Sequence, residues 1–215
     1  MNKSSAFTLN EIAVIGLLIL ITAFLIIPNL IEDDSKLEVI SSWKNSYKNM
    51  EYIFSAIQAQ ASKKDNAVFL KAKSDEEKEK ALADMLAPYL RFEKAVSIED
   101  YSPKYMNGKK INIKDEVYIT NFHLTASGKI VGVKWLNTPH LVTDNLPIAI
   151  ISVDLNGFDK PNRWGYDVFG LNLYTNKIEP IGKTNDDFLL KLDCSSSGMG
   201  LTCSYFYYNY GGQLN

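Results

Sequence analysis

The pattern of apolar and polar positions begins with a long uncharged stretch. Residues 12–31 contain no Asp, Glu, Lys or Arg, and most of them are Leu, Ile, Val or Ala. At about 1.5 Å rise per residue, a helix of this length measures roughly 30 Å, the thickness of the hydrocarbon core of a bilayer. The stretch therefore predicts a membrane-spanning helix. Glu11 immediately precedes it, and a carboxylate at the membrane is costly unless it has a partner.

A second pattern follows the acidic residues 32–34. Apolar residues recur every three or four positions, a spacing that is typical of one face of a helix. We expect the first helix to continue as an amphipathic segment over 32–62, with its apolar face packed on a sheet. The apolar positions are Leu37, Ile40, Trp43, Tyr47, Met50, Phe54, Ile57 and Ala61.

The remaining residues, 63–215, are expected to form a globular head. Ser74, with Glu77 three residues later, is a capping box that predicts a short helix over 75–86. Pro88 is expected to end this helix, because proline disrupts a helix interior. The charged residues at 75–80 are interpreted as a solvated helix face.

From about residue 116 the pattern changes to alternation with a period of two, which predicts β-strands. Ala126–Gly128 lies between two alternating runs and predicts a hairpin turn. A helix followed by an antiparallel sheet with hairpins is an α+β fold. The expected strands cover 117–122, 129–135, 148–153, 168–174 and 202–208.

Charge and cysteine content narrow the functional classes. The net charge of −2 and the pI near 5.8 argue against a nucleic-acid partner, because phosphate binding requires clustered Lys and Arg. In an exported domain, Cys194 and Cys203 would most simply form one short-loop disulfide. A zinc site needs further ligands, and the two histidines, His123 and His140, lack ligand spacing.

Three interpretations of the N-terminus are considered. A cleaved secretory signal has an apolar region of about 7–15 residues that ends at a small-residue cleavage site, and neither property is found here. A plain single-span anchor, with Lys3 on the inside, explains the hydrophobicity but leaves Glu11 without a partner.

The third interpretation rests on the run Ala6-Phe7-Thr-Leu-Asn10-Glu11, followed by the apolar stretch and Pro28. This order resembles the class III signal of type IV pilins and type II secretion pseudopilins. Two positions depart from the family pattern, since Ala6 replaces the usual Gly and Asn10 replaces a usually apolar residue.

The resemblance implies a processing and assembly route. A prepilin peptidase would remove the leader, 1–6, by cutting between Ala6 and Phe7, and would leave the apolar helix of 7–31 in place. Glu11 would then pair with the N-terminus of a neighbouring pilin or pseudopilin subunit during assembly. The implied fold is type IV pilin-like, with a long N-terminal helix packed on an antiparallel sheet.

The resemblance also implies a location and a role. The chain would cross the bacterial inner membrane once, contact its lipid, and hold its head in the periplasm until it enters a pilus or pseudopilus. Such a subunit is structural and not an enzyme. The alternatives are a membrane-anchored extracytoplasmic binding module that does not assemble, and a hydrolase, for which no G-x-S-x-G or H-E-x-x-H motif is present.

The segment 154–169 resembles a loop that is found in many type II secretion pilin-like proteins. Its oxygen-bearing side chains could bind one Ca²⁺, which takes six to eight oxygen ligands. The spacing departs from the EF-hand pattern, so a structural loop held by Asx-turns is the alternative. No other cofactor is expected. The candidate calcium ligands are Asp154, Asn156, Asp159 and Asp167.

Overall fold

A 52-residue helix, α1 (Leu9–Gln60), begins the structure, a computed structural model that describes residues 9–60, 74–136 and 146–212. Within α1, side chains are described at positions 15, 17–21 and 36–59. The chain divides into two compact units, residues 1–38 and 39–215. Among the described residues, no helix is both long enough and apolar enough to cross a bilayer. Most side chains of the expected membrane segment, 7–31, lie outside that description.

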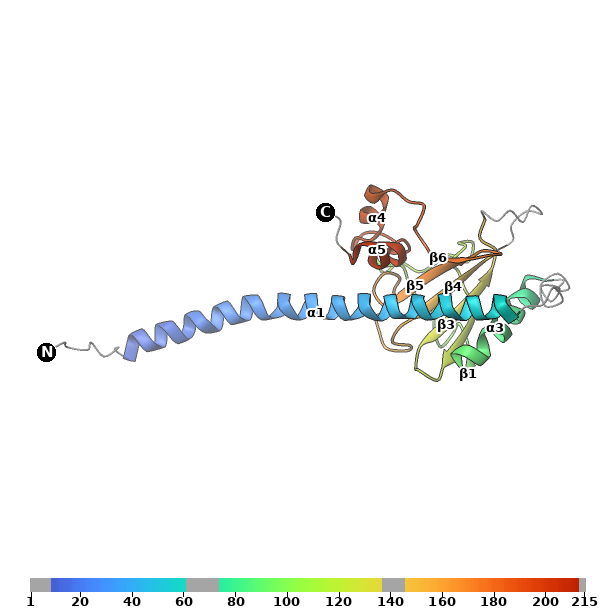
Figure 1. Cartoon of the computed structure of the whole chain (residues 1–215). Coiled ribbons are helices and arrows are strands. Elements are labelled where there is room, and N and C mark those ends of the chain that lie inside the picture. Colours follow the sequence, from blue (N-terminus) through green and yellow to red (C-terminus); the bar gives the residue numbers. More distant parts are fainter. Residues whose placement is uncertain (1–8, 61–73, 137–145, 213–215) are drawn as a thin grey trace. The chain divides into compact units, whose positions relative to one another are not determined.

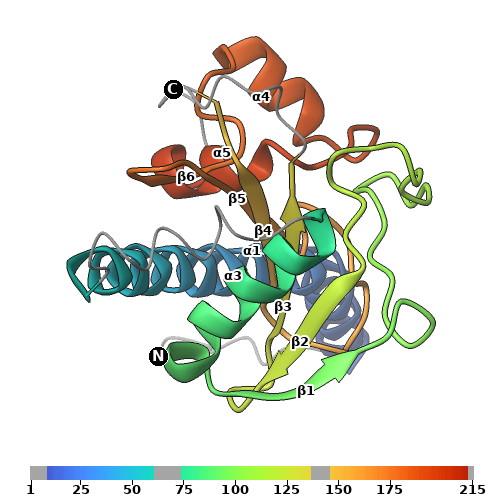
Figure 2. The same ribbon diagram turned by 90° about the vertical axis from the view of Figure 1, so that its right-hand side faces the viewer.

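The centre of the 39–215 unit is a six-stranded antiparallel sheet, consistent with the expected α+β class. Its strands follow one another in chain order, so that each pairs with its neighbours in the sequence (Figure 2). The strands are β1 (Phe92–Val96), β2 (Asn121–Thr125), β3 (Ile130–Trp135), β4 (Ala149–Asp154), β5 (Val168–Leu173) and β6 (Ile178–Pro180).

Both faces of the sheet are covered. Every residue of β4 is buried. Ala149, Ile151 and Val153 belong to one hydrophobic cluster, and Ile150 belongs to another. One cluster joins β3–β5 to α1 and to α3 (Asp75–Leu90), and the other joins them to the segment 97–120. Burial on both faces explains why β4 is almost continuously apolar.

A row of small residues makes room for aromatic rings on the second face. Phe122, Gly132, Ser152 and Gly170 are register partners on four adjacent strands. A Cβ atom on Gly132 would meet the Phe122 ring, and one on Gly170 would meet the ring of Trp164. The two glycines therefore allow close packing of rings on this face.

The apolar face of α1 packs on the sheet, as the sequence predicted (Figure 1). The Trp43 ring is fully buried and stacks on Phe169 at 4.9 Å between ring centroids. Its indole Nε1 donates a hydrogen bond of 2.7 Å to the Ser204 carbonyl. The prediction was wrong for Leu37, which is 60% exposed and belongs to the 1–38 unit. Ala61 lies outside the described residues.

The helix α3 begins as predicted, with the Ser74 hydroxyl accepting a hydrogen bond from the Glu77 amide. It does not stop before Pro88, and it ends where the Arg91 amide donates to the Ala87 carbonyl at 2.8 Å. A proline in the last turn removes only one amide donor, so the helix tolerates it.

The interpretation of residues 75–80 as a solvated helix face was wrong for Glu79, which is buried and accepts a hydrogen bond from the Trp135 amide at 2.9 Å.

The C-terminal region differs from the prediction. The expected strand 202–208 is a helix, α5 (Cys203–Tyr210), which ends at Gly211 with a positive φ of 61°. A second short helix, α4 (Asp187–Asp193), precedes it. A short run of aromatic residues is compatible with the period of a helix and with that of a strand, so the sequence pattern alone does not distinguish them.

The N-terminal side of the sheet also differs. The predicted strand 117–122 was wrong for residues 117–120, which precede the first residue of β2, Asn121. The strands β1 and β6 were not predicted. Both lie at sheet edges, where a strand contributes few inward side chains and gives little alternation to detect.

Candidate functional site

The Asp154 carboxylate lies at the end of β4 and is 1% exposed. Its Oδ1 accepts hydrogen bonds from the amides of Asn156 at 3.1 Å and Gly157 at 2.8 Å. Its Oδ2 accepts a hydrogen bond of 2.7 Å from the Tyr101 hydroxyl. These contacts form an Asx-turn that redirects the chain after the strand.

A second buried carboxylate, Asp167, holds the other end of this loop. Its two oxygens accept hydrogen bonds from the amides of Arg163 at 2.6 Å and Asn162 at 2.8 Å. Burial, with a further contribution from the Asp167 charge, raises the pKa of Asp154 to about 7. Burial likewise raises the pKa of Asp167 above its ordinary value. The loop therefore brings two acids together in a poorly solvated place.

Of the four candidate calcium ligands, Asp154 and Asp167 lie in one electrostatic environment, and the side chain of the exposed Asn156 hydrogen-bonds Asp167. Asp159 is exposed. Within the described ranges, no group of three or more His, Cys, Asp or Glu residues is placed to bind a metal ion. Backbone amides already occupy both buried carboxylates. This arrangement agrees with the Asx-turn alternative, and calcium binding stays a prediction.

The Tyr101 contact was not predicted. Tyr101 lies 53 positions before Asp154 and reaches it from the segment that covers the second face of the sheet. Its hydroxyl is buried, and burial raises its pKa above the ordinary value. No local pattern identifies such a partner, because only the tertiary fold brings the two residues together.

Cys194 and Cys203 form the predicted disulfide. The loop that it closes is also held by Asp193, which was not among the predicted site residues. The Asp193 carboxylate accepts hydrogen bonds from the amides of Met199, Gly200 and Thr202, and from the Thr202 hydroxyl. An acidic residue next to a cysteine is the only sequence signal for this role.

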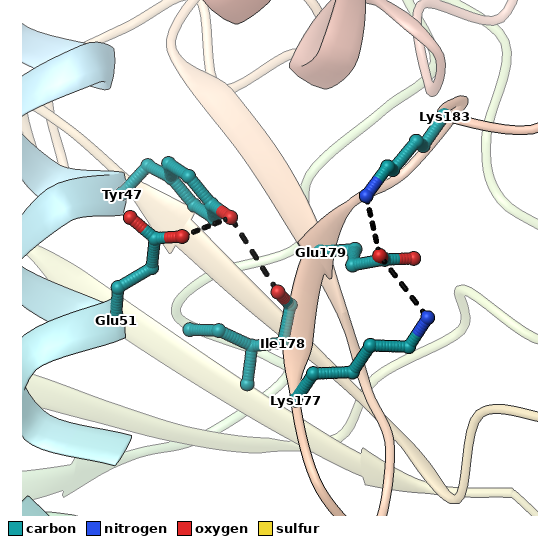
Figure 3. A network of polar contacts seen from close by, with 6 residues as sticks. All are labelled: Tyr47, Glu51, Lys177, Ile178, Glu179 and Lys183. Carbon is teal, nitrogen blue, oxygen red and sulfur yellow. Dashed lines mark hydrogen bonds and ion pairs between the residues drawn. The ribbon is translucent and has the colours of Figure 1, made fainter. Parts of the chain in front are cut away.

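Polar contacts join α1 to the last strand of the sheet (Figure 3). The Tyr47 hydroxyl lies 2.6 Å from Glu51 Oε1 and 3.4 Å from the Ile178 carbonyl. Burial and the neighbouring Glu51 raise the pKa of Tyr47, so the hydroxyl remains a donor. On the same strand, Glu179 pairs with Lys183 at 2.5 Å and with Lys177 at 3.2 Å. Of these contacts, the hydrogen bond from Tyr47 to the Ile178 carbonyl is the one that joins α1 to β6.

The part of α1 within residues 1–38 exposes apolar side chains. Each of the described ones is between 45% and 69% exposed. Single exposed apolar residues are ordinary on a protein surface, but a contiguous group indicates an interaction surface. We name this group the apolar helix surface; it comprises Ile15, Leu17, Leu18, Ile19, Leu20 and Ile21.

The predicted processing residues, Ala6 and Phe7, lie outside the described residues. Glu11 lies in α1, but its side chain also lies outside them. Of the two histidines, His140 is outside the described ranges. His123 stacks on the Phe92 ring at 4.6 Å and lies 2.8 Å from Asn121 Oδ1, an arrangement that fits a structural residue.

No family model matches this chain. No curated protein matches it, and no solved structure matches it either.

Proposed function

We propose that this chain is a structural subunit of a type IV pilus or a type II secretion pseudopilus, and that it has no enzymatic activity. The observation that carries the proposal is the apolar helix surface, exposed on the same long helix whose later residues pack on an antiparallel sheet. A surface of this kind requires lipid or other helices to cover it. The pilin-like N-terminal signal accounts for both kinds of cover: lipid would cover the surface before assembly, and the helices of neighbouring subunits would cover it afterwards.

In this proposal the prepilin peptidase first removes 1–6 and creates a charged N-terminus at Phe7. The helix then remains in the inner membrane, with the 39–215 unit in the periplasm. During assembly, the helices of neighbouring subunits replace the lipid around it. Glu11 pairs with the N-terminus of the adjacent subunit. Such a pair offsets the large cost of an isolated carboxylate in an apolar medium.

The second candidate function is an anchored extracytoplasmic binding module that remains a monomer. The apolar helix surface is compatible with it, because an anchor also needs lipid cover. It gives Glu11 no role, and this difference separates the two functions. The experiment therefore targets that carboxylate.

The test compares Glu11→Ala with the matched control Glu32→Ala in a cell that supplies the assembly machinery. We expect Glu11→Ala to enter the membrane and to keep the stability of the head, but to lose sedimentable polymer. Glu32→Ala should polymerise like the unaltered chain. Normal polymer from Glu11→Ala would contradict the pairing and would favour the monomeric module.

A further inference from the structure

A small cleft opens between α1, the C-terminal end of α3 and the β2–β3 hairpin, within the 39–215 unit. Its volume is about 150 Å³. The cleft has a buried apolar floor and an exposed polar rim. The floor is formed by Met50, Val131 and Val153, and the rim by Asn45, Asn49 and Ser127.

One charged side chain lines this cleft. Lys129 is half-buried, and its Nζ donates a hydrogen bond of 2.6 Å to the Ser46 hydroxyl. The Ser46 hydroxyl in turn donates to the Ser42 carbonyl at 2.8 Å. None of the ion pairs among the described residues includes Lys129. Its ammonium has three donors, and the Ser46 contact uses one of them.

The backbone around Lys129 is held firmly. The Thr125 hydroxyl accepts a hydrogen bond from the Lys129 amide at 3.1 Å and donates one to the Lys129 carbonyl at 3.0 Å. These bonds fix the base of the lysine side chain at the hairpin turn. The Ser46 contact holds the ammonium beside the cleft, so that a ligand there would restrict the lysine side chain less.

The chemistry of the lining residues selects an anion. No Asp or Glu lines the cleft, and the rim amides and hydroxyl add neutral donors beside the ammonium. Burial lowers the pKa of Lys129, and a bound anion would offset the desolvation that causes this. The apolar floor adds a second requirement, because an inorganic anion would leave it uncovered.

We propose that this cleft binds a carboxylate on a short aliphatic stem, with the carboxylate on the Lys129 ammonium and the stem on Met50 and Val131. Charge-assisted hydrogen bonds of this kind are stronger than neutral ones. The ligand is either a free small carboxylate or an Asp or Glu side chain of a second copy of this chain. The proposal does not depend on the proposed function.

The probe is butyrate, titrated into the full chain and followed by amide NMR shifts of residues 125–131. Butyramide, which has the same shape without the charge, serves as the ligand control. We expect shifts with butyrate and none with butyramide. Lys129→Gln should weaken binding about tenfold or more, because it removes a charge-assisted contact. Lys129→Arg should retain binding, and so should Lys48→Gln, which removes an exposed charge from α1, the helix that lines the cleft.

The proposal is overturned if butyrate causes no shifts, if butyramide causes the same shifts, or if Lys129→Gln binds as well as the unaltered chain. An unchanged melting temperature of Lys129→Gln shows that lost binding does not reflect lost folding. Sedimentation with and without butyrate then separates the sources. Dissociation of an oligomer by butyrate assigns a side chain of a second copy, and an unchanged mass assigns a free carboxylate.

Discussion

Among the individual residues, Asp154 combines two opposing effects. Three hydrogen-bond donors favour its ionised form, whereas burial and the nearby Asp167 charge favour the protonated form. Burial and the Asp167 charge have the larger effect, and together they raise the pKa of Asp154 to about 7. The loop 154–169 is thus predicted to be most stable when one proton is bound.

The first prediction is a pH dependence of stability. In the unfolded chain the pKa of an Asp is about 3.9, so between about pH 4 and pH 7 the folded state binds a proton that the unfolded state has released. The free energy of unfolding should therefore fall as the pH rises through this window and should level off above it. Urea unfolding of the detergent-solubilised chain at a series of pH values, with EDTA present, measures this.

Asp154→Asn is the matched variant, because its side-chain oxygen still accepts from the Asn156 and Gly157 amides. It should flatten the slope between pH 4 and pH 7. An unaltered slope in this variant would assign the titration to another group.

The second prediction concerns calcium. If the Asx-turns and the amide contacts of the two buried carboxylates alone hold the loop, excess Ca²⁺ and excess EDTA should give the same melting temperature. Differential scanning calorimetry of the unaltered chain measures this. A higher melting temperature with Ca²⁺ that disappears in Asp154→Asn would favour the calcium interpretation of this loop over the Asx-turn alternative.

At the scale of the elements, the sequence predicted best where many side chains repeat one period. The buried face of α1 shows the helical repeat of apolar positions. The central strands β3, β4 and β5 are apolar runs long enough to be recognised as strands. It predicted poorly where a single distant contact decides the outcome. Glu79 and Tyr101 are held by residues far along the chain, and no window of sequence contains both partners.

The third prediction concerns the packing of α1 on the sheet. Trp43→Ala removes a fully buried ring from between α1 and β5, and should lower the free energy of unfolding by about 3–5 kcal/mol. Tyr52→Ala is the control, because Tyr52 is on the same helix and is 72% exposed. It should change stability by about 0.5 kcal/mol or less. Urea unfolding followed by circular dichroism compares them, and similar losses in both would contradict the assigned face.

The fourth prediction concerns the link between α3 and β3. Glu79→Ala leaves the Trp135 amide without its acceptor and should cost about 1–3 kcal/mol. Glu79→Gln keeps an acceptor oxygen and should restore most of this loss. The exposed Glu76 supplies the control variant Glu76→Ala. If Glu79→Ala unfolds at the same urea concentration as Glu76→Ala, the buried contact has no energetic role.

At the scale of the whole molecule, some parts of the assembly proposal rest on the sequence and others on the structure. The α+β class of the 39–215 unit is evident in both, whereas the processing residues and Glu11 are supported by the sequence alone. The apolar helix surface is relevant to both, because the sequence predicts an apolar helix there and its described side chains are exposed. Folding physics can show that such a surface needs cover, but cannot identify the helix that provides it.

The most direct test of the assembly proposal is the N-terminus of the chain after co-expression with a prepilin peptidase. We expect the intact mass to fall by residues 1–6 and the new N-terminus to be Phe7. A variant that blocks cleavage, Ala6→Arg, controls for unrelated proteolysis and should keep its full length. A chain that remains uncut beside an active peptidase would contradict the proposal and would favour an anchored module that never assembles.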